Sequence, residues 1–244
     1  MSRRRELLGT LAIALAIAFG SRALLIEPFR IPSGSMLPTL WIGDHLFVNK
    51  FVYGAHVPFT NLDLPALRAP ERGEVVVFSV AVEGDKTYPA DRRADLPHED
   101  FVKRVIGLPG DRIDIVDGVV FVNGDPIESH KNGHHFTDDT GRLQDVQEVA
   151  LGQRRFSVLD DPGLRTPPPA TYNIEPGRYF MLGDNRDWSK DSREWGTVRR
   201  TDIKGPAFLL YWSWDFSGSW LDLLSPTSWA SVSVRWDRIG QAIR

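Results

Sequence analysis

Short apolar runs separated by tight-turn residues constrain the fold of this chain more than any other sequence feature. The segment 73–80, GEVVVFSV, is continuously apolar, as expected of a strand buried on both faces. Over 101–127, further short apolar runs are separated by turns that begin at Pro109, Asp117 and Asn123, and the last two are hairpin signals. With 21 glycines and 17 prolines, this pattern favours a mainly β, antiparallel domain over a helical bundle.

The N-terminal segment has the composition of a membrane-directed sequence. Arginines at 3–5 precede an apolar run that begins at Leu7. One interpretation is a transmembrane anchor over 7–26, roughly 30 Å long as a helix, with residues 1–6 in the cytoplasm. The other is a signal peptide with a small-x-small cleavage site ending at Gly20. Arginines on the leading side predict that the chain after the run is exported in either case.

Overall composition excludes several function classes. The 29 basic and 32 acidic residues give a net charge of -3, so no basic excess indicates a nucleic-acid partner. There is no cysteine, which excludes thiol catalysis, disulfides and cysteine zinc sites. His130, His134 and His135 lie in a turn-like polar stretch without an HExxH pattern, so we expect neither a metal nor a cofactor.

The segment 128–176 differs in character from its surroundings. It is polar, contains the run 167–169 of three prolines and shows no strong periodicity. We therefore expect an inserted cap or second lobe that lies outside the core, between the two parts of a catalytic β domain at 27–127 and 177–244. The tail after it is rich in tryptophan, which indicates either core packing or a belt at a membrane interface.

A candidate nucleophile lies in IPSGSMLPTL, residues 31–40, where two prolines and a glycine restrict the loop that carries Ser35. No G-x-S-x-G motif is present and no histidine lies in a familiar triad setting. A base for Ser35 could instead be Lys103, since alternation along FVKRVIG places it between Phe101 and Val105 on one face of a strand. Burial lowers the pKa of a lysine readily, which would make a neutral amine available. The alternative is an edge strand from which Lys103 reaches solvent.

A charged segment at 183–196, GDNRDWSKDSREWG, could complete such a site. A buried, neutral lysine needs an uncharged hydrogen-bond partner, and the hydroxyl of Ser189 is one. Asp191 and Arg193 could form an ion pair that fixes the loop. A plain surface loop is the alternative interpretation of the same charges.

Together these segments resemble the bacterial type I signal peptidases (leader peptidases), which are membrane-anchored Ser-Lys proteases that remove signal peptides from exported preproteins. The resemblance rests on EPFRIPSGSMLPTLWIGDHLFVNKF, GEVVVF, KRVIGLPGDRI and YFMLGDNRDWSKDSREWG, in that order. It spans almost all of the chain outside 128–176. At Trp188 the chain departs from the Gram-negative members, which usually have a small polar residue there.

The resemblance implies a role for each matching residue. Ser35 is implied as the acylated nucleophile and Lys103 as its general base, with the Ser35 backbone N–H and the Ser33 hydroxyl as oxyanion hole. Ser189 is implied to orient the lysine amine, and Asp191 and Arg193 to support its loop. Shallow pockets for the small residues before the cut are implied at Phe29, Ile31, Pro32, Ser33, Met36, Leu40, Leu46, Phe101 and Val102.

The resemblance further implies a fold of two small barrel-like antiparallel β sheets with an inserted second lobe, behind one retained transmembrane helix. It implies a single-pass protein of the bacterial inner membrane whose catalytic domain faces outward, close to the bilayer and the secretion translocon. Substrates would be the signal peptides of exported preproteins, cut after Ala-x-Ala-like sites without a cofactor. Two alternatives stay open: a dedicated peptidase for one pilus or conjugation substrate, and an inactive tethered β domain that binds extended peptides.

Overall fold

The computed structural model describes residues 7, 9–10, 25–54, 64–165, 168–215 and 232–244. The predicted anchor at 7–26 lies almost entirely outside these residues. In the part of the chain that is described, no helix is long and apolar enough to cross a membrane.

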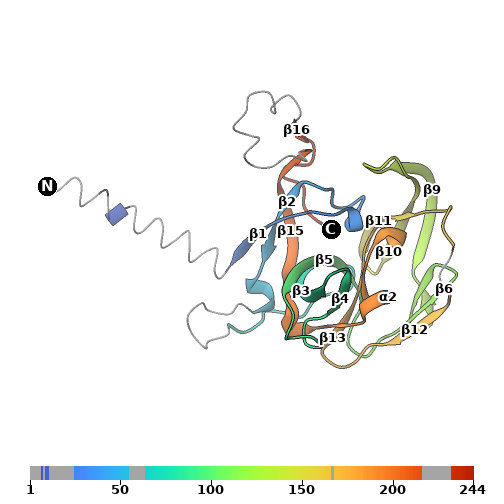
Figure 1. Ribbon diagram of the computed structural model, residues 1–244. Coiled ribbons are helices and arrows are strands. Elements are labelled where there is room, and N and C mark those ends of the chain that lie inside the picture. The colour runs from blue at the N-terminus through green and yellow to red at the C-terminus, as the bar shows by residue number, and fades with distance from the viewer. Residues whose placement is uncertain (1–6, 8, 11–24, 55–63, 166–167, 216–231) are drawn as a thin grey trace.

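The largest unit is a nine-stranded sheet in which every strand pair is antiparallel (Figure 1). Its continuous path runs β1-β2-β15-β3-β5-β13-β14, while β4 pairs with β3 and β16 with β15. The strands are β1 (Ile26–Arg30), β2 (Asp44–Asn49), β3 (Val75–Glu83), β4 (Lys86–Pro89), β5 (His98–Gly107), β13 (Arg178–Leu182), β14 (Val198–Arg199), β15 (Ile203–Asp215) and β16 (Ser233–Val234). The predicted buried strand at 73–80 is confirmed as β3, whose first four residues are all buried.

A four-stranded sheet contains the predicted hairpins. Its order is β12-β6-β7-β8, formed by β6 (Arg112–Val116), β7 (Val119–Val122), β8 (Asp125–Pro126) and β12 (Ala170–Asn173). Asp117 and Asn123, each followed by glycine, begin the two hairpin turns with φ of 50° and 55°. This left-handed backbone is what Asp-Gly and Asn-Gly hairpins require, so both hairpin predictions are confirmed.

The third sheet corrects one expectation about the segment 128–176. It has the order β11-β10-β9, formed by β9 (Glu128–Thr137), β10 (Leu143–Leu151) and β11 (Arg154–Asp160). All three strands belong to the segment expected as an inserted second lobe, and they form a sheet beside the two already described. Five side chains of the segment also enter the core, where they pack in one cluster with Ile106 and Phe180: Val149, Leu151, Phe156, Val158 and Ile174.

The polar composition of β9 explains why the sequence did not show this. All but one of its ten residues are exposed, whereas β10 and β11 bury apolar side chains at alternate positions, Val149 and Leu151 in β10 and Phe156 and Val158 in β11. Averaged over the whole segment, the exposed strand hides the periodicity of the other two. The expectation that the segment lies outside the core is therefore wrong.

Short helical turns connect the strands and include the residues of interest. They are η1 (Gly34–Met36), η2 (Phe51–Tyr53), η3 (Arg186–Trp188), α2 (Ser192–Trp195) and η4 (Arg200–Asp202). In Figure 1, the β9–β11 sheet lies on the opposite side of the molecule from β1 and β2, and η1 and η3 lie in segments that connect strands of the main sheet.

Candidate active site

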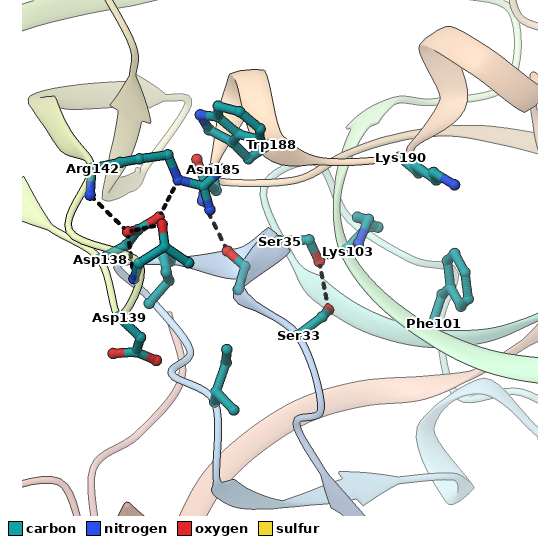
Figure 2. A pocket seen from close by; sticks show the side chains of 14 residues that line it. Ser33, Ser35, Phe101, Lys103, Asp138, Asp139, Arg142, Asn185, Trp188 and Lys190 are labelled. Atoms are coloured by element: carbon teal, nitrogen blue, oxygen red, sulfur yellow. Dashed lines mark hydrogen bonds and ion pairs between the residues drawn. The ribbon is translucent and has the colours of Figure 1, made fainter. Parts of the chain in front are cut away.

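Ser35 lies in η1, between strands β1 and β2. The loop is anchored before and after it: the Ile31 N–H donates to Asp44 O (2.8 Å), and Met36 is buried with 1% of its surface exposed. These contacts hold the turn in place. The half-buried Ser35 lies in this turn, and its side chain faces the cleft (Figure 2).

Lys103 approaches Ser35 from strand β5. Its Nζ lies 2.6 Å from Ser35 Oγ and also donates to Val102 O at 3.1 Å. Because β5 pairs with β3 on one side and β13 on the other, it is a central strand, and Lys103 is only 3% exposed. The alternative of a solvated lysine on an edge strand is therefore wrong.

Burial changes the acidity of this amine. Desolvation lowers the pKa of Lys103 to about 8, and the carboxylates of Asp191 and Asp184, which act in the opposite direction, offset only part of the effect. The Phe101 ring adds an apolar wall, with its centroid 5.5 Å from Nζ.

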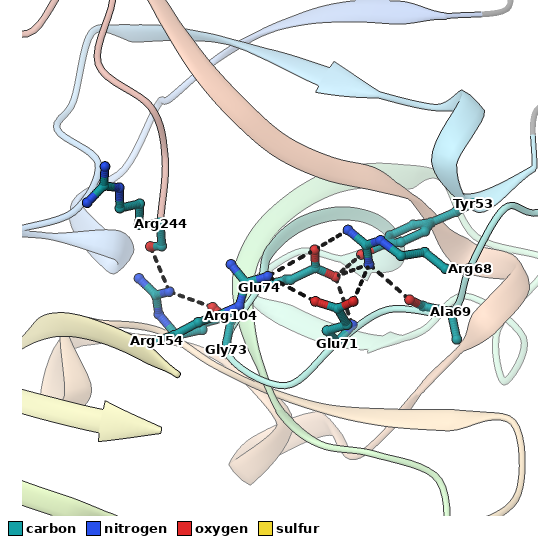
Figure 3. Close-up of polar contacts among 9 residues, drawn as sticks. All are labelled: Tyr53, Arg68, Ala69, Glu71, Gly73, Glu74, Arg104, Arg154 and Arg244. Atoms are coloured by element: carbon teal, nitrogen blue, oxygen red, sulfur yellow. Dashed lines mark hydrogen bonds and ion pairs between the residues drawn. The ribbon is translucent and has the colours of Figure 1, made fainter. Parts of the chain in front are cut away.

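Arg104 faces the opposite side of β5 and is fully paired. Its Nε and Nη2 donate to Asp184 at 2.8 and 2.6 Å. Its Nη1 donates to Gly73 O at 2.7 Å (Figure 3). Thr39 donates to the same carboxylate at 2.6 Å. This ion pair ties β5 to the loop after β13 and to the loop after η1.

A second buried carboxylate, Glu74, lies near Arg104 in the same view (Figure 3). It accepts hydrogen bonds from the hydroxyl of Tyr53 at 2.6 Å and from two nitrogens of Arg68, at 2.5 and 2.9 Å. Arg154 of β11 reaches it at 3.4 Å. The Arg154 contact links the start of β3 to the three-stranded sheet. On the Ser35 side of β5, Lys103 forms no ion pair with any described residue.

The Ser33 hydroxyl is the next polar group beside the nucleophile. Its Oγ lies 3.4 Å from Ser35 Oγ, and the two side chains point toward one another in Figure 2. Ser33 is exposed, so its hydroxyl can turn to a substrate in the cleft.

The structure does not bond Ser189 to Lys103. Ser189 is 8% exposed, and its Oγ has no hydrogen-bond partner among the described residues. It packs closely over Gly183: a Cβ at that position would lie 2.2 Å from Ser189 Oγ and 2.5 Å from Ser35 O. Only glycine permits this approach, which brings the Ser189 loop against the Ser35 turn.

Asp191 and Arg193 form a two-pronged ion pair in the Ser189 loop. Arg193 Nε and Nη2 each lie 2.8 Å from a different oxygen of Asp191, which is fully buried. The same carboxylate accepts the N–H of Gly183 at 3.0 Å. The pair therefore connects the loop to the end of β13 next to Ser35.

The residues implied as substrate pockets divide into two groups. Ile31, Met36, Leu40 and Leu46 are almost fully buried in one apolar cluster, against which Phe29 and Val102 pack. Pro32 is exposed, and Phe101 lines the same cleft as Ser33, Ser35 and Lys103.

Sequence analysis missed two residues that hold the Ser35 turn. Asn185 donates from its backbone N–H to Ser35 O (3.2 Å) and from Nδ2 to Gly34 O (3.0 Å). Its Oδ1 accepts from Gln144 Nε2 at 2.8 Å, and Gln144 is fully buried in β10. Asn185 stands in the charged motif, but Gln144 lies in the segment expected outside the core, where no sequence signal marked it.

Within the described residues, no group of three or more His, Cys, Asp or Glu side chains is arranged to hold a metal ion. The site brings together a serine hydroxyl, a buried amine of lowered pKa and a neighbouring hydroxyl. A neutral amine at this distance can accept the serine proton, which is the chemistry of a serine hydrolase.

Comparison with known proteins agrees with this chemistry. The family model described as Signal peptidase, peptidase S26 matches residues 4–212. Signal peptidase I of Pseudomonas aeruginosa is 36% identical over 214 residues, covering 82% of this chain and 69% of the relative. Signal peptidase I of Haemophilus influenzae is 30% identical over 250 residues, covering 87% and 71%.

Two further comparisons extend this range. A probable signal peptidase I-2 of Synechocystis is 32% identical over 240 residues, covering 94% of this chain and 86% of the relative. A crystal structure of a signal peptidase I from Enterococcus faecalis is 22% identical with a TM-score of 0.32, covering 57% of this chain and 97% of the other.

The family match and the sequence relatives place the chain in the class of serine peptidases. Within that class, it belongs to the signal peptidase family, peptidase S26. The resemblance to bacterial type I signal peptidases is confirmed.

Proposed function

We propose that this chain cuts signal peptides from exported preproteins through an acyl-enzyme on Ser35, with Lys103 as the general base. Family membership supports signal-peptide removal by a serine peptidase. The observation that carries the finer proposal is the 2.6 Å separation between Ser35 Oγ and an Nζ that is desolvated and free of ion pairs among the described residues.

In the first step, the neutral amine of Lys103 takes the hydroxyl proton while Ser35 Oγ attacks the carbonyl carbon of the scissile bond. With a pKa of about 8, roughly a tenth of the molecules hold this amine neutral at pH 7. The resulting ammonium gives its proton to the leaving amine of the mature chain. A water molecule, deprotonated by the same lysine, then hydrolyses the ester.

Negative charge on the carbonyl oxygen needs donors that are in place before the reaction. The Ser35 backbone N–H and the Ser33 hydroxyl would supply them, because both belong to the turn that Asn185 and Met36 fix. The hydroxyl of Ser189, buried without a partner among the described residues, is available to the lysine amine when it shifts during turnover.

The substrate would bind as an extended strand beside this turn. β1 ends the main sheet and leads into the Ser35 loop, so it offers an edge to which a peptide can add. The buried cluster under the cleft leaves little depth, since Leu40 and Leu46 are both 0% exposed. Shallow pockets of this kind would admit small side chains before the cut, as at Ala-x-Ala sites.

A membrane location completes the proposal. The segment 7–26 would anchor the chain in the inner membrane with residues 1–6 in the cytoplasm and the catalytic domain outside, close to the translocon. Near the end of β15, Trp212 packs edge-on with Trp214 and with Trp236, which is 72% exposed. Exposed tryptophan of this kind suits contact with the lipid interface.

Replacement of the nucleophile tests the proposal. Ser35→Ala should lower cleavage of a model preprotein by at least about a thousandfold and leave the thermal unfolding midpoint of the chain unchanged. Retained cleavage would exclude Ser35 as nucleophile.

A panel of unrelated preproteins separates the alternatives. General cleavage supports a housekeeping peptidase, and cleavage of a single substrate supports a dedicated one. If an acylating inhibitor fails to label Ser35 and no preprotein is cut, the chain is a peptide-binding domain and the proposal is wrong.

A further inference from the structure

The cleft that contains Ser35 and Lys103 has a wall that the proposed chemistry does not use. The cleft has a volume of about 370 Å³ and is lined on this side by Trp188 of η3 and by the β9–β10 turn, residues 138–142. None of these residues is implied as a contact for the residues before the cut. Figure 2 shows Asp139 and Arg142 on one side of Ser33 and Ser35, and Phe101 on the other.

The ring of Trp188 is held in place. The guanidinium of Arg142 lies 3.7 Å from its ring centroid, and the indole Nε1 donates to Asp161 at 3.2 Å. The Trp188 backbone N–H donates to Asn185 O at 3.2 Å. With 40% of its surface exposed in the cleft, the ring is a fixed apolar surface and not a loose side chain.

Arg142 is itself fixed by the β9–β10 turn. Its Nε donates to Asp138 at 2.8 Å, and the same carboxylate accepts from the hydroxyl and the N–H of Thr140, at 2.6 and 2.9 Å. Burial alone would raise the pKa of Asp138, but these hydrogen bonds outweigh it and lower the pKa to about 2. The β9–β10 turn of the three-stranded sheet therefore holds this wall in place before a substrate binds.

The position of this wall relative to Ser35 defines what it can bind. An extended peptide that passes Ser35 must leave the site on the side opposite the one where it enters. The residues implied for the positions before the cut lie at the end of β1, in the β1–β2 loop, on β2 and at Phe101 and Val102 of β5, and none lies in the β9–β10 turn or in η3. The Trp188 side therefore lies along the path of the residues after the cut.

We propose that Trp188, backed by Arg142, forms a subsite for the first residues of the mature chain. This inference rests on the proposed function and extends it to the leaving side of the scissile bond. An indole face stacks with apolar and planar side chains, so the subsite selects such residues directly after the cut.

Two series of preproteins test this with the full chain in detergent. One series keeps the signal peptide and changes the second residue after the cut among Ala, Leu, Phe and Glu. The other changes the residue before the cut among Ala, Gly and Ser. We expect kcat/KM to be about fivefold higher for Leu and Phe than for Ala and Glu in the first series.

Variants of Trp188 and Arg142 then show whether these side chains cause that preference. Trp188→Ala should reduce it to less than about twofold and leave the ratios of the second series unchanged, whereas Trp188→Phe should keep it. Arg142→Gln should give an intermediate preference because the ring loses its cationic partner. Leu143→Ala is the matched control, since Leu143 is an exposed apolar residue of the same hairpin that does not line the cleft.

Three results would overturn the inference: no preference in the first series, a preference that survives Trp188→Ala, or an equal loss on all substrates, which would mark Trp188 as structural. Binding of the same sequences as peptides to Ser35→Ala protein, measured as Kd, gives the comparison without chemistry. If the proposed function is wrong, no preprotein is cleaved. If only this inference is wrong, the Kd values of the peptides are the same with Trp188 and with Trp188→Ala.

Discussion

The two faces of strand β5 treat neighbouring cations in opposite ways. Arg104 is fully buried and bonded through two nitrogens to Asp184. Lys103, the residue before it, is also buried, but among the described residues its amine hydrogen-bonds only to the Ser35 hydroxyl and to Val102 O. One buried cation is thus matched by a buried anion at bonding distance and the other is not.

The difference supports the proposed role of Lys103 as a base. A carboxylate at bonding distance would stabilise the ammonium and raise the pKa, which would leave far less of the Lys103 amine neutral at pH 7. Asp191 and Asp184 act on it only from beyond ion-pair distance, so desolvation dominates and the pKa is lowered to about 8. Arginine would remain charged on either face. In the proposed mechanism, the amine of Lys103 can act as a base because it forms no ion pair with any described residue.

Replacing Lys103 by another cationic side chain should have the largest effect on cleavage. Lys103→Arg keeps a positive charge but cannot accept a proton, so kcat/KM for preprotein cleavage should fall by at least about a thousandfold. Circular dichroism should show the same β content as the unmodified chain. Near-normal turnover would remove lysine from the mechanism.

Breaking the Arg104–Asp184 ion pair on the other face of β5 should lower the free energy of unfolding more than it lowers the rate of cleavage. Asp184→Asn leaves Arg104 charged and buried without its anion, which should lower the free energy of unfolding by about 3 kcal/mol in a denaturant titration. Asp100→Asn is the control, because its ion pair with Lys204 is partly exposed and should contribute less than about 1 kcal/mol. Equal effects of the two changes would contradict the contrast between the faces.

The Lys103 face depends on a smaller contact from the inserted segment. Gln144→Ala removes the partner that orients Asn185 and should lower kcat by about tenfold, with little change in KM, because the Ser35 turn loosens relative to Lys103. Gln147→Ala on the same strand is the matched control, since Gln147 bonds to Asp160 and not to the site. A loss of stability without a change in kcat would show that Gln144 has only a structural role.

The features that could be predicted from the sequence are those encoded by a few neighbouring residues. The hairpins at Asp117 and Asn123 were predictable because turn geometry is encoded in two residues. The buried strand at 73–80 was predictable from its unbroken apolar run. Ser35 and Lys103 were found as candidates because each lies in a short motif of restricted conformation or strict alternation.

Features that depend on contacts between distant segments were not predictable in the same way. Gln144 and Asn185 are 41 residues apart and meet only because the three-stranded sheet packs against the Ser35 loop. The sheet itself was hidden because one of its strands is almost entirely exposed. Ser189 Oγ, which has no hydrogen-bond partner within the described part of the chain, packs closely over Gly183, and no single motif reveals this contact.

The pH dependence of Ser35 acylation tests the central claim most directly. Intact mass measured over time, with an acylating inhibitor at pH 6 to 10, gives the rate of ester formation on the full chain, and Ser35→Ala serves as the blank. Because only the neutral amine of Lys103 accepts a proton, the rate should rise with pH through a single limb near pH 8 and then level off. A rate that is independent of pH across this range, or that rises only above pH 10 as for a solvated lysine, would contradict the account.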